Sequence, residues 1–345
     1  MNSEAEDLPL AGIRVIDLTR LLPGPLATLH LAQWGAKVVK IEGLADQGQD
    51  DPMRQMGRTH EDIAAGQPSM AFRMLNAGKQ LQTLDLRESA GRDALIDEVR
   101  DADVLIEGFR PGVMDRLGLG WDVVHAANPR LVMCAISGYG SKGVWSHRAG
   151  HDINYIAMAG VLDQIGTDSG EIAVPNFQIG DLLGGSQSAL SGTLAALVAA
   201  QRTGLGRFVD VSMAHELMRH NVLAAATLSA TGHVTAAGRD LLSGGAPCYG
   251  AYRTSDGRHL AVGALEFKFW QQLCETLDRP AWIHRHWTKG EAPGSDGAMT
   301  LKAEVAGVFA AHPLTHWTGL FEAVDCCVTP VLRLHEARSH PLFMA

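Results

Sequence analysis

The alternation of hydrophobic and polar positions predicts an α/β domain in the first part of the chain. Short apolar runs, typical of buried strands, alternate with stretches of helical periodicity. Strands are predicted at 13–19, 37–42, 81–86, 103–107, 131–137 and 208–212, and helices at 25–34, 88–99, 181–201 and 215–232. This alternation is typical of a parallel sheet covered by helices on both faces. We expect a Rossmann-like sheet, although no G-x-G-x-x-G dinucleotide motif follows the first strand.

The pattern changes after residue 225. Two strands and two helices are predicted there, at 249–254, 258–264, 267–277 and 301–310. Ser255-Asp256-Gly257 lies between the two strands and is typical of a hairpin turn. We therefore expect a large α/β domain over 1–225 and a small α+β domain over 226–327.

Composition narrows the class of protein. The chain is 46% hydrophobic and carries a formal net charge of −9, so it can bury a core but lacks the basic face that nucleic-acid binding requires. Five cysteines, an odd number, suggest a reducing compartment. The first residues are acidic and polar, and no apolar run reaches the ~18 residues of a membrane span. We expect a cytoplasmic protein with no nucleic-acid or membrane partner.

Three polar residues stand beside glycines or at element boundaries. His151 follows a Gly/Ser-rich loop, and a histidine with its ordinary pKa of about 6.5 exchanges protons readily near neutrality. Asp181 opens a predicted helix, whose dipole would hold it as a carboxylate. Glu266 lies between apolar residues before an aromatic helix start. Each also has a plainer interpretation, as a surface histidine, a helix N-cap or a capping carboxylate, and for His151 and Asp181 the residues alone favour it.

Gly184 and Gly185 fall in the first turn of the same predicted helix, where each costs roughly 1 kcal/mol relative to alanine. Close approach of a ligand and close packing of another helix explain them equally well. A scattered basic set in the first domain either meets phosphates or is merely solvated: Arg73, Lys79, Arg87, Arg110 and Arg116. A metal site at His284 and His286 is disfavoured, because no carboxylate or cysteine stands at ligand spacing.

Several long motifs occur in a fixed order along the chain. They are LAGIRVIDLT at 10–19, PGP at 23–25, LAQWGAKVVKIE at 31–42, LDL at 84–86, DVLIEGFRPG at 103–112 and RLG at 116–118. In sequence and order these motifs resemble the family III coenzyme A transferases, from about residue 8 to residue 341. The resemblance implies an enzyme with an acyl-CoA substrate.

Residues 149–155, Ala-Gly-His-Asp-Ile-Asn-Tyr, resemble the α-methylacyl-CoA racemase branch of that family. Racemases carry a histidine at the position of His151, which the transferases typically lack. The resemblance implies that His151 and Asp181 serve opposite faces of the α-carbon as proton shuttles, with Glu266 partnering the histidine. Substrate contacts are implied for Asp152, Asn154, Gly184 and Gly185. A backbone N–H near Asp152 would meet the enolate oxygen, and no metal or organic cofactor is expected beyond the CoA of the substrate.

The resemblance also concerns CoA binding and assembly. Gly43 stands where racemases usually carry a nucleotide-binding arginine. Arg54, Arg58 or Lys79 is therefore expected to supply that charge, and Arg110 and Arg116 are also expected to contact CoA. In the family the chain end returns to the first domain and two ring-like subunits interlock. We expect 328–345 to rejoin the large domain and the protein to form a homodimer of this interlocked kind.

The leading interpretation is thus a racemase or epimerase of 2-methylacyl-CoA thioesters that acts through an enolate. The alternative is an acyl-CoA:carboxylate CoA-transferase in which Asp181 is the nucleophile. A third interpretation is a protein that binds CoA thioesters without turnover.

Overall fold

The computed structural model describes residues 7–344 and divides the chain into two compact units. The first unit contains the residues up to Leu162 together with Val174–Val222, and the second contains Asp163–Ala173 together with the residues from Leu223 onward. The main division therefore falls close to the expected boundary at 225. The short segment Asp163–Ala173, expected in the first domain, groups with the second unit.

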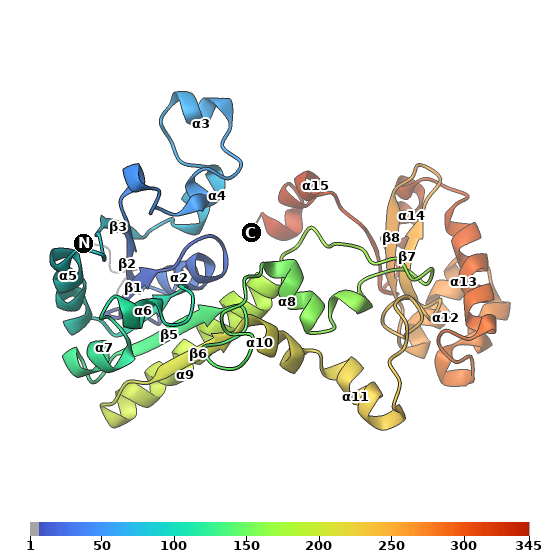
Figure 1. Ribbon diagram of the computed structural model, residues 1–345. Helices are drawn as coiled ribbons and strands as arrows, with labels where there is room; N and C mark the ends of the chain where they lie inside the picture. The colour runs from blue at the N-terminus through green and yellow to red at the C-terminus, as the bar shows by residue number, and fades with distance from the viewer. Residues whose placement is uncertain (1–6, 345) are drawn as a thin grey trace. The chain divides into compact units, whose positions relative to one another are not determined.

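The first unit is built on a six-stranded parallel sheet with the order β3-β2-β1-β4-β5-β6 (Figure 1). The strands are β1 (Arg14–Leu18), β2 (Lys37–Glu42), β3 (Gln80–Thr83), β4 (Val104–Glu107), β5 (Val132–Ser137) and β6 (Phe208–Ser212). This is the doubly wound order in which the chain reverses direction across the sheet between β1 and β4. The predicted Rossmann-like fold is confirmed.

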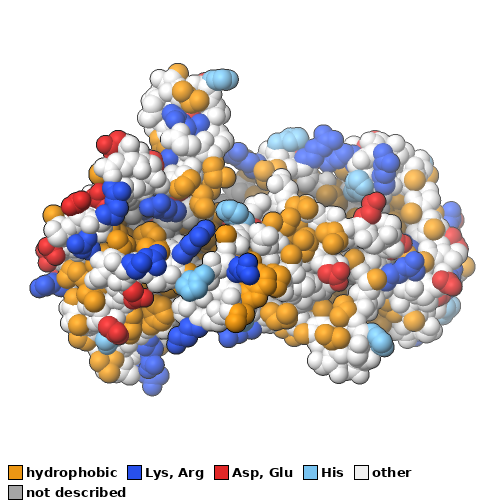
Figure 2. Space-filling view, in the orientation of Figure 1, with side chains coloured by type: hydrophobic (Ala, Val, Ile, Leu, Met, Phe, Trp, Pro, Cys, Tyr) orange, Lys and Arg blue, Asp and Glu red, His pale blue; other side chains and the backbone are white. Residues whose placement is uncertain are grey.

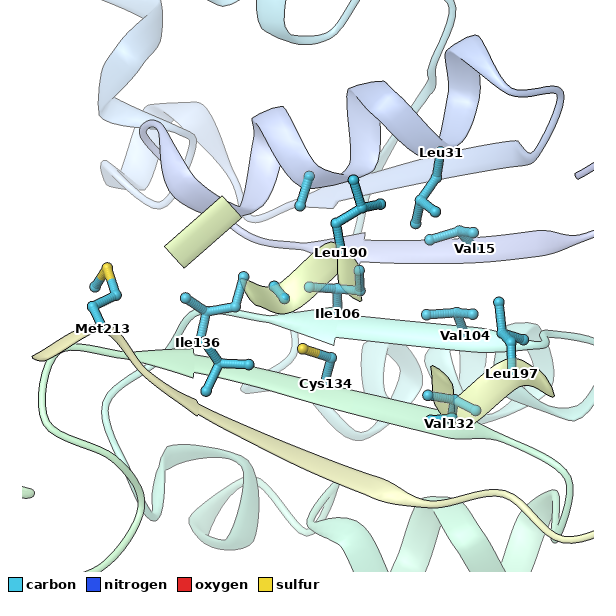
Figure 3. Packing of buried hydrophobic residues seen from close by; sticks show 14 of the residues in the cluster. Val15, Leu31, Val104, Ile106, Val132, Cys134, Ile136, Leu190, Leu197 and Met213 are labelled. Atoms are coloured by element: carbon cyan, nitrogen blue, oxygen red, sulfur yellow. The ribbon is translucent and has the colours of Figure 1, made fainter. Parts of the chain in front are cut away.

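Helices cover both faces of this sheet because successive strand residues point to opposite sides. On one face α2 (Pro23–Gln33) and α9 (Ser188–Thr203) pack against the strands, and Figure 3 shows Leu31, Leu190 and Leu197 over the β-branched side chains of the sheet. On the other face α5 (Ser89–Arg100) and α7 (Trp121–Ala127) enclose a second core. The two cores hold the strands in place and so fix where each strand ends.

The predicted helix at 181–201 begins with a π-helix. Residues Gly180–Gln187 form η4, a π-helix that leads directly into α9. Together Gly180–Thr203 are long and apolar enough to cross a membrane, with a mean hydropathy of 1.3, but core helices pass the same test. Ala189, Leu190, Ala196 and Leu197 are buried in the core of the first unit, so α9 serves as a core helix.

The remaining elements of the first unit are short. They are η1 (Ala45–Gln47), η2 (Pro52–Arg54), α3 (His60–Ala64), α4 (Met70–Leu75), α6 (Val113–Arg116), α8 (Asp152–Met158) and α10 (Met213–His220). The predicted helix at 215–232 is interrupted at Asn221, whose φ of −77° and ψ of 48° end α10 before α11 (Val222–Thr231) begins.

The second unit contains an antiparallel sheet with the order β7-β8-β9. The predicted hairpin is present as β7 (Tyr249–Arg253) and β8 (His259–Gly263). Helices α12 (Phe267–Thr276), α13 (Asp296–Phe309) and α14 (Leu314–Phe321) enclose its core around Trp270, Phe309 and Trp317. Its other helical elements are η3 (Leu162–Gln164) and α11 (Val222–Thr231) at the unit boundaries, η5 (Pro280–Arg285), η6 (Trp287–Lys289), α15 (Leu334–Arg338) and η7 (Pro341–Phe343). The predicted small α+β domain is thus confirmed as a fold.

The end of the chain differs from the expectation that 328–345 rejoins the large domain. β9 (Val328–Pro330) pairs with β8 through Val328, Thr329 and Pro330. Beyond it, Glu336 of α15 forms an ion pair with Arg258. Strand pairing and this ion pair therefore hold the last segment within the second unit.

Candidate functional site

A cavity of about 480 Å³ lies at the carboxyl ends of β1, β4 and β5 in the first unit. Its walls come from the segments that leave these strands, Thr19–Gly24, Gly108–Pro111 and Ser137–Gly138, together with the region around His151. Because strand order reverses between β1 and β4, the segments leaving these two strands diverge and a crevice forms between them. Ligands of open α/β sheets bind at this place.

His151 lines the cavity immediately before α8 and is exposed. Its backbone is extended, with φ of −129° and ψ of 178°. The Asn154 side chain accepts a hydrogen bond from the His151 N–H, with an N–O distance of 3.0 Å. The predicted residue Asn154 therefore fixes the backbone of the histidine and also lines the same cavity.

Asp181 lines the same cavity from η4. Its backbone N–H donates to Oδ1 of Asp152 over 2.9 Å, which ties the π-helix to the start of α8. A Cβ atom at Gly180 would lie 2.9 Å from that same Oδ1 and 3.2 Å from the Asp152 carbonyl oxygen, so glycine favours the close approach of the two segments. The predicted residues His151, Asp152, Asn154 and Asp181 are thus brought together.

The carboxyl group of Asp181 has a pKa raised to about 6. Burial is the main cause and the negative charge of Asp152 adds to it, while His151 acts in the opposite direction. This differs from the expectation that the helix dipole holds Asp181 firmly as a carboxylate. Near neutral pH both protonation states of Asp181 are accessible, which suits an acid/base group.

Tyr155, which carried no predicted role, lines the cavity near His151 and packs on a second tyrosine, Tyr139, in the core. Tyr155 donates its hydroxyl to the Gly150 carbonyl, and the Tyr139 ring meets it edge to face. Burial, followed by the charge of Asp181, raises the pKa of Tyr155 to about 12. A Cβ atom at Gly138 would lie 2.3 Å from the Tyr155 ring. The glycine after β5 was the available sequence signal for this close approach.

Three arginines, Arg20, Arg110 and Arg148, line the cavity. Within residues 7–344 none of their guanidinium groups has a hydrogen bond or an ion pair. Arg20 lies over the Phe109 ring and Arg148 over the Trp145 ring, at 5.9 and 5.6 Å from the ring centroids. Figure 2 shows several Lys and Arg side chains close together on the visible face of the first unit. Unpaired guanidinium groups are suited to phosphate or carboxylate groups of a ligand.

Lys79 and Arg54, which were also predicted to contact CoA, form ion pairs with carboxylates of the protein instead. The Lys79 side chain is 0% exposed, and its Nζ lies 3.1 Å from Oδ2 of Asp17 and 2.8 Å from the Pro25 carbonyl oxygen. Burial lowers the pKa of Lys79, against the opposing effect of Asp17. Arg54 is paired with Glu42 and lies over the Phe72 ring, 4.0 Å from its centroid.

Arg116 is exposed and does not line the cavity, and its guanidinium group lies beside Gly112. Gly184 and Gly185 also have a role other than substrate contact. A Cβ atom at Gly184 would lie 2.7 Å from the Met213 carbonyl oxygen, and one at Gly185 would lie 2.7 Å from Cβ of Pro23. Of the two explanations for these glycines, the structure supports close packing of η4 against α10 and α2.

Glu266 belongs to the second unit, where it immediately precedes α12 and is exposed. Its carbonyl oxygen accepts from the N–H groups of Phe269 and Trp270, but its carboxylate makes no capping hydrogen bond. The plainer interpretation as a capping side chain is therefore not supported, and its pairing with His151 stays a prediction. His286 uses its ring nitrogens on Thr288 and the Leu265 carbonyl. Among residues 7–344 no cluster of three potential metal ligands occurs.

Comparison with known proteins agrees with this geometry. Residues 10–345 match the family described as CoA-transferase family III, and the chain belongs to that family. It is 33% identical over 336 residues to a human α-methylacyl-CoA racemase, covering 96% of this chain and 80% of that protein. It is 32% identical to an acetyl-CoA:oxalate CoA-transferase of Acetobacter aceti, covering 96% and 83% of the two chains.

A crystal structure of a Mycobacterium tuberculosis protein has the same fold. It superposes with a TM-score of 0.79 at 28% sequence identity, covering 97% of this chain and 87% of that one. The predicted family is therefore confirmed. The relatives include both racemases and CoA-transferases, so the family alone defines an enzyme of acyl-CoA thioesters.

Proposed function

We propose that the protein is a racemase or epimerase that interconverts the two hands of 2-methylacyl-CoA thioesters. The observation that carries this proposal is that His151 and Asp181 line one cavity from different segments of the chain. Racemisation requires one proton-exchanging group on each face of the α-carbon, in opposite protonation states. Similarity to the human racemase supports the same assignment.

In the proposed reaction, one group removes the α-proton and the other returns a proton to the opposite face. A thioester α-proton is weakly acidic, so the base must be close and the enolate oxygen must be stabilised. The N–H of Asp152, in the first turn of α8, has no intrahelical acceptor and is our candidate donor to that oxygen. With a pKa of about 6, Asp181 would act as base for one hand of the substrate and as acid for the other.

The CoA portion would be held by charge and by aromatic contact. Arg20, Arg110 and Arg148 supply unpaired positive charge inside the cavity of a chain whose net charge is −9. That local charge offsets the repulsion an anionic substrate would otherwise meet. We propose no cofactor beyond the CoA of the substrate. We keep the homodimer and the orienting role of Glu266 as proposals, tested by sedimentation and by the Glu266→Gln variant.

The decisive experiment is incubation with a 2-methylacyl-CoA in deuterated water. The expected result is deuterium at the α-carbon together with a mixture of both hands. Replacement of either His151 or Asp181 should abolish interconversion, because one face is then without a proton donor or acceptor. Retained α-hydrogen with transfer of CoA to a free acid would overturn the proposal.

The second candidate is a CoA-transferase in which the Asp181 carboxylate attacks the thioester carbonyl, the C–S bond breaks with release of the CoA thiolate, and a mixed anhydride remains. The similarity to the Acetobacter aceti transferase favours this alternative. It requires exchange between acyl-CoA and free acids, and trapping of Asp181 by hydroxylamine. Neither is expected for a racemase, so hydroxylamine inactivation that depends on acyl-CoA would favour the transferase.

A further inference from the structure

The cavity segment Thr19–Gly24 has a backbone that needs support from elsewhere. Leu21 has a φ of 65°, in the left-handed region that a residue with a side chain rarely adopts. Thr19 packs so closely on Gly24 that a Cβ atom at Gly24 would lie 2.2 Å from Cβ of Thr19. Thr19, Leu21 and Gly24 all line the cavity, so the shape of this wall depends on interactions that maintain the backbone conformation of the segment.

A buried ion pair supplies the first support. Lys40 and Asp51 have side chains that are 0% exposed, and their charged groups lie 3.2 Å apart. Nζ of Lys40 donates to the Thr19 carbonyl over 2.7 Å, while Oδ1 of Asp51 accepts from the Leu21 N–H over 2.9 Å. The ion pair therefore fixes the segment at the Thr19 carbonyl and at the N–H of Leu21, the residue with the left-handed backbone.

A buried serine supplies the second support and connects the segment to the reacting group. Ser186 lies in η4 and is 0% exposed. Its hydroxyl is within hydrogen-bonding distance of the Pro23 carbonyl oxygen, at 2.7 Å, and of the Asp181 carbonyl oxygen, at 3.2 Å. One side chain thus bridges the cavity segment and the backbone of Asp181.

We infer that Ser186 and the Lys40–Asp51 pair are positioning residues that set the Asp181 carboxyl group against the Thr19–Gly24 wall. None of the three lines the cavity, so none is placed to touch substrate. The inference rests on the proposed acid/base role of Asp181. The ion pair holds the backbone of the Thr19–Gly24 segment, and Ser186 connects Pro23 of that segment to the backbone of Asp181.

The first test compares Ser186→Ala with Ser188→Ala. Ser188 is the first residue of α9, and its hydroxyl donates to the Leu183 carbonyl over 2.9 Å rather than to the cavity segment. In α-deuteration kinetics, Ser186→Ala should lower kcat about tenfold with KM changed less than about twofold. Ser188→Ala should leave both nearly unchanged. Equal behaviour of the two variants would overturn the inference.

The second test separates the hydrogen bonds of Asp51 from its charge. Asp51→Asn keeps an oxygen that can accept from the N–H groups of Leu21 and Met53, whereas Asp51→Ala removes it. We expect Asp51→Asn to retain most of kcat and Asp51→Ala to lose more. Equal loss in the two variants would contradict a positioning role. If Asp51→Ala fails to fold, the two serine variants still decide the question.

A third measurement needs no turnover. Carbon-13 NMR of the Asp181 carboxyl group would follow its titration in the wild-type protein, Ser186→Ala and Ser188→Ala. Loss of the Ser186 bridge should admit water and move the pKa of Asp181 downward by about half a unit or more. A wild type without α-deuteration would refute the proposed function. An unmoved titration in Ser186→Ala would refute the positioning role alone.

Discussion

Two groups of charged side chains lie around β1, and they are used differently. Toward β2 and β3, the side chains of Asp17, Lys40, Asp51 and Lys79 are 0% exposed and form ion pairs with one another. Toward β4 and β5, Arg20, Arg110 and Arg148 line a cavity and, within the described chain, have no carboxylate partner. The first group stabilises the fold and the second leaves its charge for a ligand.

The difference shows that a basic residue near a strand end is not by itself a ligand contact. Lys79 and Arg110 have the same charge. Lys79 directly precedes β3, and Arg110 follows β4. Lys79 forms an ion pair with Asp17. Burial of Asp17 acts to raise its pKa, but the positive charges of Lys79 and Lys40 outweigh burial and lower the pKa to about 2. Arg110 has no such partner. The partner, more than the residue type, determines which role the cation has.

The largest effect is expected on the cavity side, at Asp181. Asp181→Asn removes one proton-exchanging group, and general acid/base groups contribute about 10²–10⁴ in rate. We expect interconversion of the two hands to fall by roughly 10³-fold, while the protein remains folded. Chiral chromatography of the acyl-CoA products measures the loss. A variant with more than a tenth of wild-type activity would remove Asp181 from the mechanism.

On the paired side, Lys79→Met should act on stability. Removal of one partner leaves the buried charge of Asp17 without its nearest cation, which typically costs about 3–5 kcal/mol. Because Thr19, Thr28 and Lys40 still stabilise Asp17, we expect a loss of about 3 kcal/mol in the free energy of unfolding. Urea unfolding measures it. A loss below about 1 kcal/mol would place Lys79 with the solvated residues.

Arg110→Met provides the matched change on the cavity side. Since Arg110 is exposed and has no ion pair, the free energy of unfolding should change by less than about 0.5 kcal/mol. KM for the acyl-CoA should rise about tenfold, corresponding to roughly 1.4 kcal/mol of binding. The same steady-state assay checks both substrate hands. An unchanged KM, or a stability loss like that of Lys79→Met, would erase the distinction between the two regions.

An effect of similar size concerns how the stability of the folded protein depends on pH. The pKa of Asp181 in the folded protein, about 6, lies above its ordinary value. The protonated carboxyl group therefore contributes fully to the free energy of unfolding below about pH 4, and this contribution is lost as the pH rises through 6. Asp181→Asn should therefore become more stable than wild type as pH rises from 4 to 7, by about 1–2 kcal/mol for a half-buried group. Thermal unfolding of both proteins across that range measures the difference. A constant difference would contradict the raised pKa.

Much of the fold could be predicted because local patterns specify it. Consecutive β-branched residues such as Val38 and Val39 fit a strand buried on both faces, and Ser255-Asp256-Gly257 fits a hairpin turn. The break at Asn221 was missed because neither glycine nor proline marks it. The π-helix was missed because a hydrophobic pattern does not distinguish it from an α-helix.

The site was predictable only where a residue's role is local to its segment. His151, Asp152 and Asn154 are adjacent in sequence, and family resemblance joined them to Asp181. The partners of Lys79 and Arg54 could not be predicted in this way. Lys79 meets Asp17 across 62 positions of the chain, a distance that single-sequence patterns do not span. Gly184 and Gly185 fitted two explanations until the neighbouring helices were placed.

The π-helix at Gly180–Gln187 makes the site sensitive to the length of this segment as well as to its composition. A π-helix places more residues in each turn than an α-helix, in which each residue advances by about 100°. The π-helix therefore already accommodates an extra residue, and deletion of one residue between Asp181 and α9 would return the segment to an α-helix with Asp181 at nearly the same angle. Insertion of one residue in α-helical geometry would instead rotate the carboxyl group by roughly 100° about the helix axis and away from the cavity wall. The spacing between Asp181 and α9 should therefore tolerate a one-residue deletion better than a one-residue insertion.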